Sequence, residues 1–323
     1  MDKFVAGLGH LNVWSAVVEL EFGGAARPLG PVFETRFEFL AYRVHMLVVR
    51  GEVDHLERAR LRVEELLTRW SPSHPHSDIA RIITRPGRNV SVAIETLGLL
   101  GIAEIARKET RGAFDVVSPT GARPTTDTRR HTVCLPVGSR LRIAGLECGL
   151  IADMVVRDIL DAGAMGACVN INGDLRVGGV PPRLEGWIVN LAPTGMGSEQ
   201  GALVLAVGAL ATRGGYPTIR QVTVHAETAW RASVLAVAAR RLGVSQGLQL
   251  LEDNQVSAVL VDDAGPWHSI GRAWTSAGSL TDPGVSSASE RTLMRADSRE
   301  EHHHVTDRWD QHHARVSSPR LVR

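Results

Sequence analysis

Hydrophobic residues along the chain form two kinds of pattern, runs rich in β-forming residues and repeats at helical spacing, and each predicts a different kind of element. The segment Tyr42–Val49 is rich in β-forming side chains and predicts a strand. After it, apolar residues recur at helical spacing through Trp70, which predicts an amphipathic helix that Asp54 caps. Pro72 lies just beyond and marks the end of this helix.

A second amphipathic helix is predicted over residues 91–108, with Ile94, Leu97, Leu100 and Ile105 on its apolar face. Shorter patterns predict further elements. The helices are expected over residues 151–161, 229–242 and 245–251, and the strands over residues 13–22, 132–135, 140–143, 168–171, 187–191, 202–207, 221–225 and 256–261. Because helices and strands alternate irregularly, we expect an α+β fold, a single layered domain with mixed sheets packed against helices.

The composition changes twice along the chain and suggests three ranges. Residues 1–33 contain a Gly- and Pro-rich stretch and are assigned to an N-terminal extension, and residues 34–274 to the folded domain. In residues 275–323 large aliphatic side chains are rare and no periodicity remains. We expect this tail to be disordered, because so little apolar surface cannot offset an ordering cost of about 1–2 kcal/mol per residue. Its histidines have no closed geometry that predicts a metal site.

Composition and charge exclude several classes of protein. The 323 residues are 44% hydrophobic, and the net charge of +1 lacks the basic excess of a nucleic-acid-binding protein. Three cysteines, Cys134, Cys148 and Cys168, are too few and too scattered for a disulfide framework or a zinc site. No apolar run reaches the roughly 18 residues of a membrane-spanning helix, and the first residues lack the pattern of a signal peptide. We therefore expect a cytoplasmic protein with no membrane or nucleic-acid partner.

Five segments resemble, in order, the motifs of one family. They are Ser71–Arg81 (S-x-Y-x-x-x-S-E-[IL]-S-R), Arg111–Asp115 (GAFD), Glu147–Asp153 (D-L-G-G-I-A-K, or a relative that ends in Glu), Val169–Asp174 (V-N-x-G-G-D) and Ala211–Tyr216 (A-T-S-G-x-Y). On these residues the chain resembles the FAD:protein FMN transferases, the ApbE family, from about Phe37 to Trp274. No single motif is specific; their common order carries the resemblance.

The resemblance implies an activity and a set of contacts. Members of this family bind FAD and Mg²⁺ and transfer FMN, through its phosphate, to a Thr or Ser of a target flavoprotein. The positions that match cofactor contacts of the family are Ala113, Phe114, Asp115, Glu147, Asp153, Asn172, Gly173 and Asp174. The chain is thus expected to bind FAD and to have a target flavoprotein as partner.

At the implied metal site the sequence departs from the family. The family's ligands lie on a helix that reads A-D-A-L-x-T, and here Ser233 and Val237 occupy the positions of the Asp and the Thr. The remaining ligand, a backbone carbonyl, matches Leu150. Mg²⁺ prefers oxygen ligands that include one or two carboxylates, so Ser233 and Val237 are poor replacements. Magnesium binding is therefore in doubt.

A second departure concerns a whole segment. The family has H-x-x-D-P-x-T-G after its Gly-Tyr motif, but here only residues 217–220 separate Tyr216 from Gln221. The segment carries a His and an Asp, which are candidates for acid/base chemistry. Without it we assign no catalytic residue.

Some of these residues have a purely structural alternative. Asp115 could be a turn or capping carboxylate, Glu147 a surface carboxylate at a strand end, and Asn172-Gly173-Asp174 a hairpin turn, since Asn-Gly is a favoured turn dipeptide.

Three functional hypotheses remain open. The first is a transferase with a rearranged metal site, in which Arg213 or an unrecognised carboxylate compensates. The second is a non-catalytic relative that still binds flavin or a partner, and the third is a relative that keeps the fold without a ligand. We expect FAD binding weaker than is usual for the family and no detectable transfer.

Overall fold

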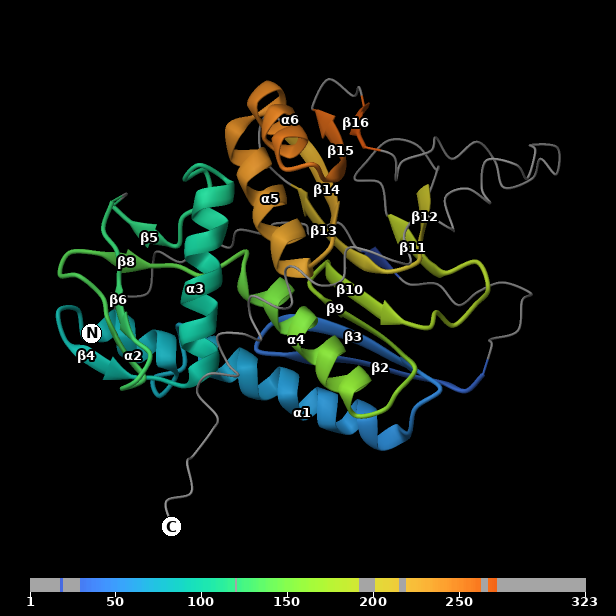
Figure 1. Ribbon diagram of the computed structural model, residues 1–323, viewed down its shortest axis with the longest axis horizontal. Coiled ribbons are helices and arrows are strands. Elements are labelled where there is room, and N and C mark those ends of the chain that lie inside the picture. Colours follow the sequence, from blue (N-terminus) through green and yellow to red (C-terminus); the bar gives the residue numbers. More distant parts are fainter. Residues whose placement is uncertain are drawn as a thin grey trace, which may run out of the picture. The chain divides into compact units, whose positions relative to one another are not determined.

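An eight-stranded sheet forms the centre of the computed structural model (Figure 1). The structure describes residues 18–19, 30–119, 121–191, 201–214, 219–262 and 267–271, which all belong to the first of the chain's two units, Met1–Ser276 and Ala277–Arg323. In spatial order the strands of the sheet are β16 (Trp267–Ile270), β15 (Ser257–Asp262), β14 (Ile219–Ala226), β13 (Gly208–Gly214), β10 (Asp174–Gly179), β9 (Gly166–Ile171), β3 (Tyr42–Val49) and β2 (Val32–Phe39). All neighbouring strands in this sheet are antiparallel.

Helices cover one face of this sheet. The helices of the described residues are α1 (Val53–Trp70), α2 (Asp78–Thr84), α3 (Ile94–Glu109), α4 (Glu147–Asp161), α5 (Ala229–Leu242) and α6 (Val244–Asp253). Helix α4 packs against β9 and β10, α5 packs against β13 and β14, and α4 and α5 contact each other (Figure 1). The helix-covered face of the central strands is therefore the place where side chains of β10, β13 and α5 meet.

A three-stranded sheet covers the opposite face. It consists of β1 (Val18–Glu19), β11 (Trp187–Leu191) and β12 (Gly201–Leu205). Leu47, Cys168 and Val177 pair across β3, β9 and β10, so they share a face, and they belong to one buried cluster with Trp187. Successive residues of a strand point to opposite faces, so Asp174, which alternates with Leu175, faces the helices.

Two small sheets lie beside α2 and α3. One contains β4 (Asn89–Ser91), β7 (Thr132–Cys134) and β6 (Thr125–Asp127), and the other contains β5 (Val117–Ser118) and β8 (Arg140–Leu141). Strand β5 begins two residues after Asp115. The second small sheet therefore holds the C-terminal end of the Ala113–Asp115 segment.

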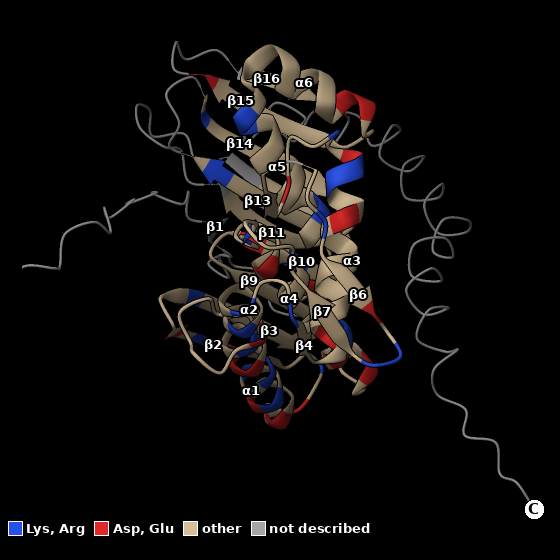
Figure 2. Cartoon of the chain, turned by 90° about the vertical axis from the view of Figure 1, so that its left-hand side faces the viewer, with Lys and Arg blue, Asp and Glu red and all other residues tan. Residues whose placement is uncertain are grey.

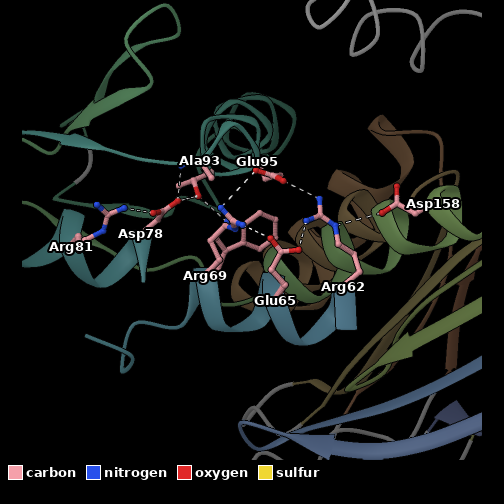
Figure 3. A network of polar contacts seen from close by, with 10 residues as sticks. Arg62, Glu65, Arg69, Asp78, Arg81, Ala93, Glu95 and Asp158 are labelled. Atoms are coloured by element: carbon pink, nitrogen blue, oxygen red, sulfur yellow. Dashed lines mark hydrogen bonds and ion pairs between the residues drawn. The ribbon is translucent and has the colours of Figure 1, made fainter. Parts of the chain in front are cut away.

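Buried and half-buried charges connect the helices of this region (Figure 3). Asp78, at the start of α2, is buried and accepts a hydrogen bond from the backbone N–H of Ala93 at 2.9 Å. Ala93 precedes α3 and has no side-chain oxygen that could cap this helix. Asp78 therefore supplies a hydrogen-bond acceptor from a neighbouring helix. Arg62 of α1 lies 3.0 Å from Glu95 of α3 and 3.6 Å from Asp158 of α4. These contacts tie α1, α2, α3 and α4 together.

Charges on the remaining surface are mixed in sign. Figure 2 shows acidic and basic residues side by side along α1, and Arg60 there lies 2.6 Å from both Glu57 and Glu64. Such pairs describe a solvated helix face rather than a basic stripe. No helix in the described part of the chain is long and apolar enough to cross a membrane.

The structure confirms the expected α+β class and most of the expected elements. The sheets were expected to be mixed, but every strand pair in the described residues is antiparallel. The strand at Tyr42–Val49 and the helix at Ala229–Leu242 have the predicted bounds. The strand predicted over residues 187–191 also has its predicted bounds, and the remaining predicted elements within the described residues differ by a few residues at their ends, because pattern and propensity locate ends poorly. Of the strand predicted over residues 13–22, only Val18–Glu19 is described, and the tail after residue 274 lies outside the described residues. The three-range division of the chain stays a prediction.

Three details of the helix predictions are wrong. Asp54 does not cap α1: Glu52 occupies that position, and its backbone N–H donates to Nδ1 of His55 at 2.9 Å. Helix α3 begins at Ile94 rather than at residue 91, because residues 89–91 pair as β4. Ile105, expected on the apolar face of α3, is 41% exposed.

A further helix boundary was displaced and several elements were not predicted. Helix α4 begins at Glu147 instead of residue 151. Helix α2 had no sequence prediction, since its seven residues are too few for periodicity to mark it. Strands β2, β4, β5, β6, β10, β13 and β16 also had none.

Gly149 sets the distance between α4 and α5, and its replacement by Ala is expected to lower stability. A methyl group there would lie 2.5 Å from the Ala229 carbonyl oxygen and 2.7 Å from the Trp230 nitrogen, both backbone atoms. We expect Gly149→Ala to lower the free energy of unfolding by about 1–3 kcal/mol in denaturant titrations. Gly101→Ala is the matched control in α3, where nothing lies within 4 Å, and should raise stability by about 0.5–1 kcal/mol. Equal effects of the two substitutions would contradict this assignment.

Candidate functional site

A buried guanidinium lies where β10, β13 and α5 meet. Nη2 of Arg213 is 2.7 Å from each carboxylate oxygen of Asp174 and 2.5 Å from Oγ of Ser233. Nη1 of Arg213 donates to the Thr212 carbonyl oxygen at 3.0 Å. Asp174 is 1% exposed and Ser233 is fully buried. The charge of Asp174 is thus balanced inside the protein by one arginine, as a buried carboxylate requires.

Strand register explains why these residues meet. Asp174 lies directly opposite Ala211 in the β10–β13 pair, and Arg213 is two residues further along β13. The two side chains are therefore diagonal neighbours on one face of the sheet. Helix α5 packs on this face, and Ser233 is buried against it. The pair is separated by 39 residues in the sequence, so it depends on the sheet being formed.

Ser233 also contacts a tight turn that precedes α4. Its Oγ lies 2.8 Å from the Gly145 carbonyl oxygen and 3.0 Å from Oδ2 of Asp174. Gly145 has a φ of +91°, which glycine adopts without strain. A Cβ on Gly145 would lie 3.0 Å from a methyl carbon of Val237 and 3.6 Å from the Phe114 ring. Ser233 and Val237 therefore lie on one face of α5, next to Phe114.

Glu147 lies at the first turn of α4 and completes a cluster with Arg213, Asp174 and Ser233, called the Arg213 cluster. It is buried, not a surface carboxylate as the structural alternative had it, and its Oε1 accepts a hydrogen bond from the Tyr42 hydroxyl at 3.3 Å. Burial raises the pKa of Glu147, the negative charge of Asp174 raises it further, and Arg213 opposes both. Burial and the neighbouring Glu147 also raise the pKa of the Tyr42 hydroxyl. The cluster thus combines two carboxyl groups with one guanidinium.

Asp153 holds the start of α5. Its two oxygens accept hydrogen bonds from the backbone N–H groups of Ala229 at 2.8 Å and Trp230 at 2.9 Å, and Nε of Arg176 lies 3.5 Å away. Burial raises the pKa of Asp153 to about 6, although Arg176 and the two amides favour the ionised form. This carboxylate therefore caps α5 from α4, and its assignment as a cofactor contact stays a prediction.

The segment Ala113–Asp115 is held in place by hydrogen bonds on both sides. The Phe114 ring is buried, and its backbone N–H donates to Oγ1 of Thr110 at 3.0 Å. Nη1 of Arg241 donates to the Ala113 carbonyl oxygen at 3.0 Å. Oδ1 of Asp115 accepts the backbone N–H of Val117 at 2.9 Å, a turn bond, and its Oδ2 lies 3.3 Å from Arg123. Asp115 thus has the structural role named as its alternative, which leaves open whether it also contacts a ligand.

Asn172 and Gly173 form the hairpin turn between β9 and β10, as the structural alternative had it. Ile171 pairs with Asp174 across them, and both turn residues have a positive φ, +51° and +90°. Oδ1 of Asn170 accepts the Gly173 N–H at 2.9 Å, and Oδ1 of Asn172 accepts the Arg43 N–H at 2.9 Å. The turn places Asp174 at the first position of β10, beside Arg213.

Comparison with known proteins identifies the fold. No protein-family model and no curated protein matches the sequence. The ApbE protein of Thermotoga maritima matches in structure with a TM-score of 0.65 at 18% identity, over 74% of this chain and 97% of that one. The flavinyl transferase ApbE of Pseudomonas stutzeri, in its apo form, matches with a TM-score of 0.67 at 18% identity, over 74% of this chain and 94% of that one. The flavin transferase ApbE of Vibrio cholerae matches with a TM-score of 0.64 at 16% identity, over 74% of this chain and 97% of that one. This chain has the ApbE fold.

Within this ApbE-like fold, the position implied for Mg²⁺ does not fit that ion. Ser233 Oγ accepts a hydrogen bond from Arg213, whose guanidinium forms an ion pair with Asp174. The side chain of Val237 has no oxygen. Leu150 lies in the first turn of α4, so its carbonyl is directed along the helix toward the next turn. Among the described residues, no group of three or more His, Cys, Asp or Glu side chains could hold a metal ion.

Sequence reasoning had not included Arg213, Tyr42 or Gly145 among the site residues of the ApbE-like domain. In the sequence, Arg213 stands where a family motif has Ser and is a candidate to compensate for the altered metal site, but nothing there pairs it with Asp174. Its ion pair with Asp174 could be found only by aligning β10 with β13, and β13 was not predicted. Tyr42 and Gly145 belong to no motif, so the sequence contains no signal for them.

Arg213→Met is expected to be strongly destabilising, because it removes the charge that balances buried Asp174. We expect a loss of about 3–5 kcal/mol in the free energy of unfolding at neutral pH. Arg231→Met is the matched control, since Arg231 also pairs with a carboxylate, Glu109, at 3.1 Å, but both side chains are about a third exposed; it should cost less than about 1 kcal/mol. In the double variant Arg213→Met/Asp174→Leu, part of the loss should be recovered, and strictly additive losses would contradict the pairing.

Asp153 is expected to make stability depend on pH between about 4 and 6. The unfolded pKa of an Asp is about 3.9 and burial raises the folded value to about 6, so the folded chain binds the proton more tightly. Its stabilising contribution is full below about pH 4 and lost as the pH rises to about 6, a change of about 3 kcal/mol. Asp153→Asn does not titrate, so wild-type stability should fall relative to this variant over that range in chemical unfolding curves. A constant difference between the two proteins would contradict the raised pKa.

Proposed function

We propose that this chain is an ApbE-like protein that binds a flavin nucleotide and in which the Mg²⁺-dependent transfer of FMN from FAD to a target flavoprotein is impaired. The observation that carries the proposal is the contact of Arg213 with Asp174 and Ser233, which fills the position implied for the metal with a side chain. We further propose a cytoplasmic location and a flavoprotein as partner, on the basis of the resemblance alone.

Flavin binding is supported by the residues around the cluster. Phe114 lies close to Gly145 and Val237, so the Ala113–Asp115 segment borders the Arg213 cluster. Arg213 is 16% exposed at its side chain and offers a positive charge to an anion such as a nucleotide phosphate. An apolar wall beside a cationic group suits a ligand with an aromatic ring system and a pyrophosphate.

Impaired transfer follows from the same residues. In a phosphoryl-type transfer, a bound Mg²⁺ bridges phosphate oxygens and neutralises the charge that develops on them. Ser233 and Val237 add no charge for such an ion, and Asp174 is already paired with Arg213. The alternative in which the chain binds flavin or a partner and performs no chemistry is therefore favoured over a rearranged transferase.

Addition of FAD to the full-length protein should raise its unfolding temperature. At a ligand concentration of about 100 times Kd, a single site adds about 2.7 kcal/mol to the free energy of unfolding, which thermal unfolding detects. When the protein is mixed with FAD and a flavoprotein domain that carries an acceptor Thr, no covalent flavin should appear by in-gel fluorescence or mass spectrometry, with or without Mg²⁺. Metal-dependent labelling of the Thr would overturn the impaired-transfer part, and absence of any FAD effect would overturn flavin binding.

The place of binding is tested by Asp115→Asn. This change keeps the turn acceptor for Val117 and removes the negative charge, and it should weaken FAD binding roughly tenfold or more if Asp115 contacts the ligand. Asp127→Asn is the matched control, because Asp127 also accepts backbone N–H groups in a turn, from Arg129 and Arg130 at 2.9 Å. Equal FAD affinity of the two variants would exclude Asp115 as a ligand contact.

A further inference from the structure

The site contains a cation of its own. Nη2 of Arg213 has both oxygens of Asp174 and Oγ of Ser233 within 2.7 Å. One nitrogen bridges the two carboxylate oxygens, whereas in an ordinary bidentate pair two nitrogens each face one oxygen. Three oxygen atoms therefore converge on a single positively charged group, in a place that is almost closed to solvent.

Two of the departures from the resembled motifs, at Ser233 and at Arg213, are complementary in charge. The family's helix motif has an Asp at the position of Ser233, and its Gly-Tyr motif has a Ser at the position of Arg213. Each replacement raises the local charge by one unit. Together they raise it by two units, which is the charge of a divalent ion, and the structure shows that the two residues are in contact.

We propose that the Arg213 guanidinium is a built-in replacement for a divalent cation: held by Asp174 and Ser233, it supplies the positive charge of the site permanently and keeps metal out. The proposal goes beyond flavin binding, because it concerns the charge of the site whether or not a ligand is present.

The surrounding residues support this assignment. Glu147 interacts electrostatically with both Asp174 and Arg213 and is held by the Tyr42 hydroxyl. Without the guanidinium, the carboxylate of Asp174 and the Gly145 carbonyl oxygen, which both contact Ser233 Oγ, would remain near a second buried carboxyl group, that of Glu147. Oxygen donors of this kind bind Mg²⁺ or Mn²⁺. The arginine is thus the group that decides whether this set binds a metal.

The test exchanges the two charges. In the variant Arg213→Ser/Ser233→Asp the guanidinium is removed and a carboxylate is introduced on the same face of α5. Mn²⁺ binding is measured by the loss of the free-ion electron paramagnetic resonance signal, and Mg²⁺ binding by thermal unfolding in magnesium against EDTA. We expect the double variant to bind Mn²⁺ roughly tenfold or more tightly than the wild-type protein, and to be stabilised by Mg²⁺ when the wild type is not.

Two control variants separate the cation from other effects. Ser233→Asp alone keeps Arg213, which should pair with the new carboxylate and leave metal binding as weak as in the wild type. Arg231→Ser removes an arginine elsewhere on α5, from its pair with Glu109, and should also leave metal binding unchanged.

Several outcomes would overturn the proposal. They are Mn²⁺ binding by the wild-type protein that Asp174→Asn abolishes, a folded double variant with no gain in metal binding, and a gain in Ser233→Asp alone that equals the gain in the double variant. If the double variant does not fold without metal, it is refolded with and without Mn²⁺. Recovery with the ion supports the proposal, and failure to recover counts against it.

A last arm connects the built-in cation to the proposed ligand and rests on the proposed function. If FAD binds, its Kd for the wild-type protein should be the same in EDTA and in millimolar Mg²⁺, and a tighter Kd in Mg²⁺ would contradict the proposal. Failure of FAD to bind under both conditions would refute the flavin-binding function instead, and the metal-binding arms would still decide the role of Arg213.

Discussion

A buried negative charge has to be balanced, and in this domain Arg213 balances Asp174. The ion pair joins two strands of the central sheet, and through Ser233 it adds α5 to them. Because neither charge can be left alone at this depth without a large cost, the positions of β10, β13 and α5 are linked by one contact. Glu147 adds to this constraint, since its burial near Asp174 favours its protonated form and so limits the negative charge in the cluster.

Patterns along the sequence predicted the parts of this fold that depend on local spacing. The apolar periodicity gave α5 its observed bounds, and the spacing of Ser233 and Val237 placed both on one helix face, where the structure has them next to Gly145. The β-forming residues of β3 and the turn at Asn172-Gly173 were equally visible, because each depends on a few consecutive residues. Local rules were sufficient wherever the interaction itself was local.

Contacts between distant segments were not predictable in this way. Arg213 reaches Asp174 only because β10 and β13 are antiparallel neighbours in one particular register. Asp153 resembles an acidic motif position, yet its oxygens bind the first amides of α5, 76 and 77 residues away in sequence. Asp78 likewise caps α3 from α2. These roles depend on which elements become neighbours, and a single sequence carries no direct signal for that.

Several motif residues also stabilise the fold. Asp115 accepts a hydrogen bond within a turn, and Asp153 caps α5. Such residues can persist for reasons of folding alone, so that motifs in the right order are compatible with a changed chemistry. Ser233, by contrast, caps no helix, and it is one of the positions, with Arg213 and Val237, at which the sequence departs from the resembled pattern.

The close approach of α4 and α5 at Gly149 has a consequence for how this architecture can change. Backbone lies against backbone there, and the Asp153 cap fastens the same junction. This junction therefore rests on backbone contacts and on the Asp153 cap, and not on the side chains of Arg213, Asp174 and Ser233. A substitution at Arg213 or Ser233 would leave this junction in place, so the shape of the fold alone does not reveal whether the cluster holds a guanidinium or a metal ion.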